Sequence, residues 1–131
     1  MSNKSEVVKI FESAAREAGK LINKEFGKVT ESKVQSKDLG DFVTNTDLET
    51  ENILLNILKK HFPNSSYLTE ESDPFKGNDE TIVIDPIDGT SNFIHGIPSI
   101  GIVIAKVHKE EITDGIIFNP VSDELFFATK D

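Results

Sequence analysis

The chain contains no cysteine and no tryptophan, and none of its apolar runs is long enough to cross a membrane. Without cysteine, disulfides and thiolate metal ligands are excluded. Basic side chains are also scarce: 14 stand against 23 acidic ones, which gives a net charge of −9. Nucleic acids and anionic membranes bind proteins through Lys and Arg, so we expect neither as a partner. The N-terminal residues alternate charged and apolar side chains and do not resemble a signal peptide, so we expect a cytoplasmic protein.

The composition is that of a folded domain. The chain has 131 residues, of which 37% are hydrophobic and 28% charged, enough to bury one core. Because the net charge is negative, an anionic substrate would need a local positive charge. A bound metal cation is one source of such a charge.

Apolar residues at helical spacing predict two amphipathic helices, over residues 7–26 and 46–62. Thr46 and Glu49 have the spacing of a capping box, which places the start of the second helix at Thr46. The polar stretch 28–45 shows little periodicity, and it predicts a mobile loop or a loose hairpin.

The rest of the chain has the pattern of β-strands joined by short connections. The predicted strands cover residues 66–69, 81–85, 100–107, 112–118 and 124–129. Short connections favour an antiparallel meander, so the predicted fold class is α+β, with two N-terminal helices packed on a mainly antiparallel sheet. Because the sequence ends two residues after an apolar strand, we expect residues 1–131 to be part of a larger fold.

The segment from Asp85 to Pro98 contains the residue types that carry chemistry. Asp85 precedes a proline and should therefore lie at the end of an extended strand. Pro86 would then turn the chain and bring Asp85 and Asp88 to one side of a tight loop. Two close carboxylates repel each other unless a cation neutralises them, and oxygen ligands favour Mg²⁺, Mn²⁺ or Ca²⁺ over zinc. Glu70, after a short strand, offers a third carboxylate.

The residues after Asp88 predict a phosphate site next to the metal. Gly89 and Thr90 open a predicted short helix, whose free N–H groups would attract a phosphate. Gly89 permits close approach of the backbone, and the Thr90 hydroxyl could orient a water molecule.

Other interpretations of these acidic residues exist. Asp-x-x-Asp-Gly is also a common turn composition, and Glu70 with Glu71 can be a solvated pair. The spacing does not fit an EF-hand loop. It also differs from that of the haloacid dehalogenase phosphatases, whose two aspartates stand two residues apart.

Three linked motifs resemble the inositol monophosphatase family of metal-dependent phosphatases. The family pattern Asp-Pro-(Ile/Leu)-Asp-Gly-Thr-x-Asn-Phe-x-His-Gly-x-Pro matches residues 85–98, and Glu-Glu-Ser matches residues 70–72. The segment 41–47, Asp-Phe-Val-Thr-Asn-Thr-Asp, is similar to the family's Asp-x-Val-Thr-x-x-Asp. The resemblance implies a layered sugar-phosphatase fold, sensitivity to lithium and a homodimer.

The resemblance also implies a metal site. Glu70 and Asp85 would hold the first metal ion, together with the backbone carbonyl of Ile87. Asp85 would bridge to a second ion that Asp88 also binds. The implied cofactor is Mg²⁺, as two or three ions, with Mn²⁺ as an alternative. Two such ions about 3.5–4 Å apart stabilise in-line displacement at phosphorus.

Catalytic and substrate roles follow from the same resemblance. Asp88, Gly89 and Thr90 would bind the phosphate of the substrate. Thr90 and Asp47 would help to activate the attacking water near Glu70. Asn92, Phe93 and Pro98 would be structural supports, and His95 would have a structural role rather than act as a general acid.

Family members are about twice as long as this chain. Their second half contributes a further metal-binding aspartate in a Trp-Asp motif, and this sequence contains no Trp. We therefore interpret residues 1–131 as the N-terminal, metal-holding portion of such a domain, with the C-terminal half absent from this chain. By itself it should be a poor catalyst and should self-associate.

The predicted reaction is Mg²⁺-dependent hydrolysis of a small phosphate monoester by metal-activated water, with inositol monophosphate as the predicted substrate. Related enzymes act on 3′-phosphoadenosine 5′-phosphate, fructose bisphosphate or histidinol phosphate, and these substrates remain alternatives. A truncated, non-catalytic binding module is an alternative from another class.

Overall fold

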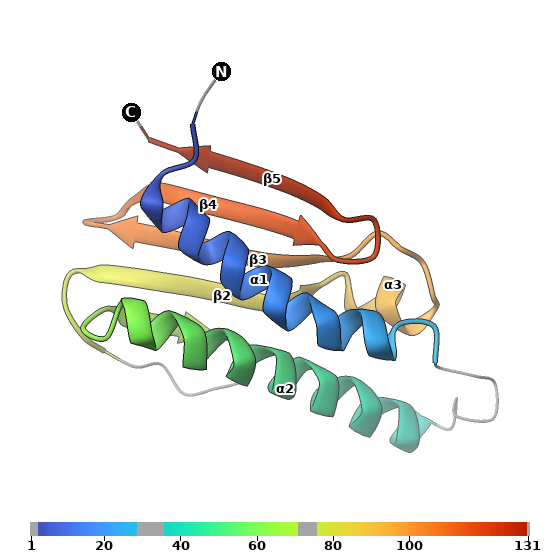
Figure 1. The fold of residues 1–131 in the computed structure, drawn as a ribbon. Helices are drawn as coiled ribbons and strands as arrows, with labels where there is room; N and C mark the ends of the chain where they lie inside the picture. The colour runs from blue at the N-terminus through green and yellow to red at the C-terminus, as the bar shows by residue number, and fades with distance from the viewer. Residues whose placement is uncertain (1–2, 29–35, 71–75, 131) are drawn as a thin grey trace.

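The computed structural model describes residues 3–28, 36–70 and 76–130. Two long helices lie on one side of a five-stranded sheet, whose strands follow the order β1-β2-β3-β4-β5 (Figure 1). The predicted α+β class is confirmed. No helix in the described part of the chain is both long and apolar enough to span a membrane.

Helix α1 spans Glu6–Glu25, close to the predicted range. It begins at Ser5, whose Oγ accepts a hydrogen bond from the Val8 backbone N–H at 3.1 Å. It ends before Gly27, whose φ of +79° suits glycine better than any other residue. Its apolar face packs against α2 and across strands β3 to β5. The first helix therefore forms as its periodicity predicts.

Helix α2 spans Ser36–His61 and begins ten residues earlier than predicted. The prediction of a loop or hairpin is thus wrong for residues 36–45, whereas residues 29–35 lie outside the described part of the chain. Thr46 lies within the helix and does not cap it. Extending a helix is easier than nucleating one, so the apolar turns around Leu54 and Leu58 can support polar turns before them.

The five strands lie where the sequence predicts them. Their bounds are β1 Ser66–Thr69, β2 Glu80–Asp88, β3 Gly101–His108, β4 Glu111–Asn119 and β5 Glu124–Thr129. Strands β2 to β5 form the predicted antiparallel meander, but β1 pairs with β2 in parallel. The prediction of a mainly antiparallel sheet is therefore confirmed, and β1 is the parallel strand at its edge. In a parallel pair, the chain must return to the end of the sheet at which the first strand begins. Because β1 has only four residues, the connection 70–79 is long enough for this return.

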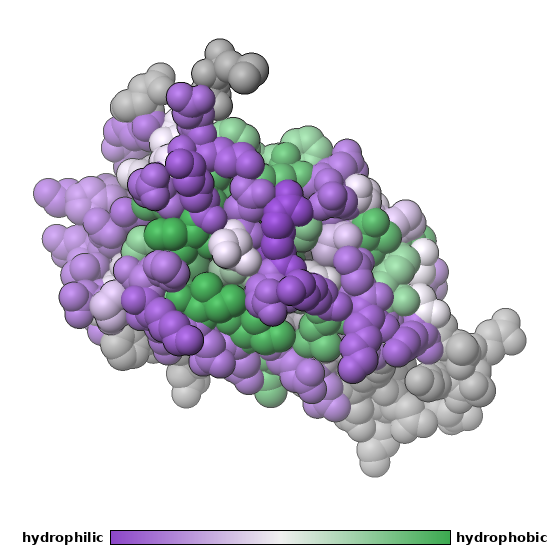
Figure 2. Space-filling view, in the orientation of Figure 1, coloured by the Kyte–Doolittle hydropathy of each residue, from purple (hydrophilic) through white to green (hydrophobic). Residues whose placement is uncertain are grey.

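The core fills the space between the two long helices and one face of the sheet. On that face the buried side chains alternate along β2, β3 and β4, as in a half-buried sheet. They include Ile82, Ile84, Ile102, Ile104, Ile116 and Phe118. The side of the molecule that bears the helices shows mostly hydrophilic residues, with hydrophobic ones between them (Figure 2). This distribution is that of a normal solvent-facing helical layer.

The opposite face of the sheet differs from the helical face. The residues that alternate with the core residues form rows across the strands, and we call this surface the open face. One row pairs Asp85 with Val103, Val103 with Ile117, and Ile117 with Phe126. The neighbouring row joins Leu68, Val83, Ala105, Gly115 and Ala128. Asp85 therefore stands at one end of an apolar row.

Candidate carboxylate site

A β-bulge in β2 brings Asp85 and Asp88 to the same face of the sheet. Asp85 pairs with Val103 and Asp88 pairs with Gly101. The chain therefore advances three residues on β2 while it advances two residues on β3. In a regular strand, residues three apart point to opposite faces, and the extra residue of the bulge reverses this. Both carboxylates therefore belong to the open face. The predicted tight loop at Pro86 is wrong, because the strand continues through Pro86 to Asp88.

Gly101 supports this assignment of faces. A Cβ atom added at Gly101 would lie 3.0 Å from Cγ2 of Ile117, which is an open-face residue. Since Gly101 is the register partner of Asp88, Asp88 lies on the same side. A proline also fits a bulge, where its missing N–H costs no ladder hydrogen bond.

Glu70 completes a cluster of three carboxylates. Thr69, the last residue of β1, pairs with Ile84 in the parallel register. Glu70 and Asp85 directly follow these two residues, and their side chains share a hydrogen bond. The pKa of Asp85 is raised to about 6, first by burial, then by a hydrogen bond with Glu70, and then by the charges of Glu70 and Asp88. A hydrogen bond from the Ile87 backbone opposes these effects. The structure thus brings together the three acidic residues that the sequence singles out.

These carboxylates have the donor chemistry of a divalent-cation site. Oδ1 of Asp85 is buried and makes no hydrogen bond with any residue that the structure describes. An unbonded buried oxygen beside two more carboxylates fits a hard cation, which would also relieve their repulsion. However, no group of three or more His, Asp or Glu side chains in residues 3–28, 36–70 and 76–130 has the spacing of a finished metal site. The metal ligands therefore stay a prediction.

Gly89 and Thr90 lie directly after the carboxylates. Gly89 has φ +90° and precedes the short helix α3, Thr90–Ile94, which confirms the predicted helix. A Cβ atom at Gly89 would lie 2.9 Å from the Ser99 carbonyl oxygen, so only glycine fits there without a shift. The Thr90 hydroxyl donates a hydrogen bond of 3.3 Å to the Ile87 carbonyl, the predicted backbone ligand. Phosphate binding at Gly89 and Thr90 stays a prediction.

The loop after α3 is held by side-chain hydrogen bonds. Asn92 Nδ2 donates to the Ser99 carbonyl at 2.8 Å, and Phe93 is buried. The Nδ1 atom of His95 lies 2.7 Å from the Ser91 carbonyl oxygen. Asn92 and Phe93 are thus structural supports, as predicted, and the contact of His95 is also of a structural kind.

Asp47 is buried within α2, with 7% of its surface exposed. It is not among the groups that shift the pKa of Asp85. Its predicted role in activating water therefore stays a prediction. The same helix buries Thr50 and Glu51 completely, and no motif in the sequence marks these two residues.

A groove of about 300 Å³ lies beside Asp88 on the open face. Its lining includes Ser99, Gly101, Asn119 and Glu124, which come from three different strands and the loop before them. No motif in the sequence marks these residues, because only the register of the sheet brings them next to Asp88. The groove offers space for a substrate beside the carboxylates.

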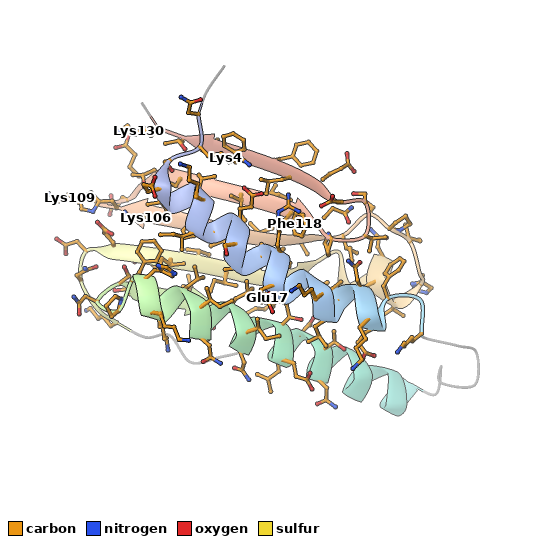
Figure 3. All side chains as sticks on the ribbon, in the orientation of Figure 1. Lys4, Glu17, Lys106, Lys109, Phe118 and Lys130 are labelled. Carbon is orange, nitrogen blue, oxygen red and sulfur yellow. The ribbon has the colours of Figure 1, made fainter. Side chains whose placement is uncertain are left out.

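The labelled lysines do not neutralise this cluster. Lys4, Lys106, Lys109 and Lys130 lie at the end of the sheet away from α3, whereas Asp88 lies next to α3 (Figure 3). Three of them are engaged elsewhere, in ion pairs with acidic side chains. A cation bound at the carboxylates would therefore meet little competition from these side chains.

Comparison with known proteins identifies the class. The model of the inositol monophosphatase family matches residues 3–131. The chain is 40% identical over 120 residues to an inositol-1-monophosphatase of Caulobacter vibrioides, covering 89% of this chain and 47% of that protein. It is 37% identical over 119 residues to the Nus factor SuhB of Escherichia coli K12, covering 89% and 45%.

Solved structures agree with the sequence comparison. The structure of the extragenic suppressor protein SuhB from Bartonella henselae superposes with a TM-score of 0.82 at 35% identity, over 95% of this chain and 48% of that one. The chain belongs to the inositol monophosphatase family. It spans about half the length of the relatives that it matches.

Proposed function

We propose that this chain is the metal-holding portion of a Mg²⁺-dependent phosphatase that hydrolyses a small phosphate monoester. The observation that carries the proposal is the bulge in β2, which places Asp85 and Asp88 on one face beside Glu70. Three carboxylates gathered at one point destabilise a metal-free fold, and a site for a cation explains why they are there.

The carboxylates would bind the metal, and Thr90 would position the attacking water. Asp85, Asp88, Glu70 and the Ile87 carbonyl would hold two or three Mg²⁺ ions, or Mn²⁺ in their place. When bound, the metal would supply a nucleophilic water and neutralise charge on the phosphate. The hydroxyl of Thr90, which already points to the Ile87 carbonyl, would orient that water.

Binding of the substrate would use the residues that follow the bulge. Gly89 keeps the backbone close to Ser99 and would present its N–H to the phosphate together with Thr90. Asp88, exposed at the edge of the groove, would lie between the metal and the alcohol part of the substrate. Asp47, on α2, would help to activate the attacking water.

The substrate that we propose is inositol monophosphate. The Caulobacter relative is named an inositol-1-monophosphatase, and the segment Thr90–Phe93 has the inositol-type form Thr-x-Asn-Phe. 3′-Phosphoadenosine 5′-phosphate, fructose bisphosphate and histidinol phosphate remain alternatives.

We also propose that millimolar lithium inhibits the complete protein, that the protein is cytoplasmic and that it forms a dimer. Since the chain matches about half of each relative, we also propose that residues 1–131 are the N-terminal portion of a larger domain.

Calorimetric titration of the chain with Mg²⁺ tests the metal assignment. Glu70→Gln should weaken Mg²⁺ binding, because it removes a charge that contacts Asp85. Asp79→Asn, an exposed acidic position before β2, is the matched control and should bind as wild type does. Equal affinities for wild type and Glu70→Gln would contradict the assignment. Turnover of inositol monophosphate and p-nitrophenyl phosphate by the complete protein then tests the reaction.

A non-catalytic role is the second candidate. It is favoured by the relatives that are named Nus factors, which are as similar as several of those named phosphatases. A complete protein that binds Mg²⁺ at Asp85 and Asp88 but hydrolyses none of the four substrate types would support this role.

A further inference from the structure

The amide side chain of Asn119 joins two segments that are far apart in the sequence. Asn119 ends β4, and its Nδ2 donates a hydrogen bond of 2.7 Å to the Pro98 carbonyl in the loop after α3. Its Oδ1 accepts hydrogen bonds from the backbone N–H groups of Val121 and Ser122, at 3.0 and 3.2 Å. The loop and the β4–β5 turn lie at the same end of the sheet (Figure 1). One side chain therefore closes the turn and also holds the loop against it.

The β4–β5 turn is a firm support, because α1 holds it. Asn23 Nδ2, on α1, donates a hydrogen bond of 2.9 Å to the Pro120 carbonyl. Arg16 Nη1, one helical region earlier, lies 2.7 Å from Oδ1 of Asp123. A Cβ atom added at Gly19 would lie 2.9 Å from Cβ of Pro120, so the helix and the turn are in close contact. The turn is thus fixed to a helix that packs on the core.

The loop after α3 needs a support of this kind. Residues 95–99 are all exposed, so the loop buries little apolar surface that would hold it in place. Ser99 must stay in place, because its carbonyl packs against Gly89, where an added Cβ atom would lie 2.9 Å from the Ser99 oxygen. Asn92 donates to the same carbonyl, but it belongs to α3 and moves with it. The bond from Asn119 adds a hold from the sheet.

We propose that Asn119 is a positioning residue for phosphate binding at Gly89. By holding the Pro98 carbonyl it would fix the adjoining Ser99 carbonyl, and hence the Gly89 backbone whose N–H would face the phosphate. Asn119 also lines the groove beside Asp88, so the bond lies at the rim of the proposed site. This inference rests on the proposed function and extends it to a residue outside the three sequence motifs.

Loss of this bond should weaken the binding of phosphate more than it slows the reaction. Glu70, Asp85 and Asp88, the proposed metal ligands, follow β1 or belong to β2, so the metal should still bind. A displaced Gly89 would hold the phosphate less well in the bound substrate and in the transition state alike. Such a loss of uniform binding raises KM and leaves kcat nearly unchanged.

Asn119→Ser in the complete protein tests the proposal. A serine hydroxyl can still accept from the Val121 N–H, but it is too short to reach the Pro98 carbonyl. Asn119→Asp is the second variant, because it keeps the shape and the accepting Oδ1 and replaces only the donor by an oxygen. The matched control is Asn23→Ser, which removes an amide–carbonyl hydrogen bond from the same turn but has Pro120 as its partner.

Calorimetry in saturating Mg²⁺ measures the Kd of inorganic phosphate, and turnover of p-nitrophenyl phosphate gives KM and kcat. Asn119→Ser should raise the phosphate Kd and KM about fivefold or more, the usual effect of one hydrogen bond, and change kcat less than about twofold. The affinity for Mg²⁺ should also stay the same, and Asn119→Asp should act in the same direction. Asn23→Ser should leave all four quantities unchanged, although thermal melts should show a similar loss of stability for Asn119→Ser and Asn23→Ser.

Three results would overturn the inference. A phosphate Kd and a KM that Asn119→Ser leaves unchanged would show that the bond only stabilises the fold. Equal rises for Asn119→Ser and Asn23→Ser would show a general loosening of the turn. A wild type that binds no phosphate in Mg²⁺ would overturn the phosphatase proposal as well. If the wild type binds phosphate, loses affinity with Asn119→Ser and turns over no substrate, only the phosphatase proposal fails.

Discussion

Replacing Asp88 by Asn separates the stability of the fold from the function of the site. Asp88 is exposed at the end of β2, and its negative charge contributes to the raised pKa of Asp85. The substitution keeps the shape of the side chain and removes one charge from the carboxylate cluster. In the absence of metal, we therefore expect a stability within about 0.5 kcal/mol of wild type, as for other exposed positions.

The effect of Mg²⁺ on stability should be different. A ligand that binds only the folded state at ten times its Kd stabilises that state by about 1.4 kcal/mol. For a chain of this size, that corresponds to a rise in melting temperature of about 5 °C. Asp88→Asn removes a proposed ligand, so most of this rise should be lost, and turnover by the complete protein should fall more than tenfold.

The assay is a pair of thermal melts followed by circular dichroism, one in EDTA and one in Mg²⁺. Asp79→Asn removes the same charge from an exposed position away from the cluster and should keep the full rise. An Asp88→Asn variant that keeps the same Mg²⁺-induced rise, or more than a tenth of wild-type turnover, would refute the assignment of Asp88.

Three further substitutions test the scaffold by denaturant unfolding. Glu110→Gly should stabilise the chain by about 1 kcal/mol, because Glu110 has φ +67° in the β3–β4 turn, a conformation that glycine adopts without strain. Gly19→Val should cost about 1–3 kcal/mol, since a Cβ at Gly19 would lie 2.9 Å from that of Pro120 in the β4–β5 turn. Lys4 and then Arg16 hold the pKa of Glu12 below its usual value, and the Glu12 side chain is only 17% exposed. That stabilisation is present above about pH 4.5 and lost as the pH falls, so Glu12→Gln should cost about 1 kcal/mol at pH 7 and progressively less as the pH falls below about 4.5. A cost that stays constant with pH would contradict the last of these.

The strands were predictable because their signal is local. Alternating or continuous β-branched residues between turn residues gave all five strands, and β5 has the predicted bounds. The first helix was equally predictable, because its apolar stripe is regular over its whole length. These elements contain in their own sequence the pattern that their packing requires.

The features that the sequence does not predict depend on contacts with other parts of the chain. The start of α2 was missed because residues 36–45 have little periodicity of their own and form helix as an extension of a packed one. The parallel pairing of β1 was missed because sequence spacing does not fix strand direction when a connection is ten residues long. The groove beside Asp88 was missed because Gly101 and Glu124 meet there only through the register of three strands.

The bulge in β2 explains why an acidic site can sit inside a core strand. Asp85 and Asp88 face the open side, while Pro86 and Ile87, the residues between them, are buried. A regular strand could not do this, because it would direct one of the two carboxylates into the core, where an unpaired charge is costly. The sequence Asp-Pro-Ile-Asp therefore meets two demands at once: the apolar pair extends the core, and the extra residue turns both carboxylates away from it. Because they are turned toward the open face, whatever covers that face must also accommodate the charge at Asp85.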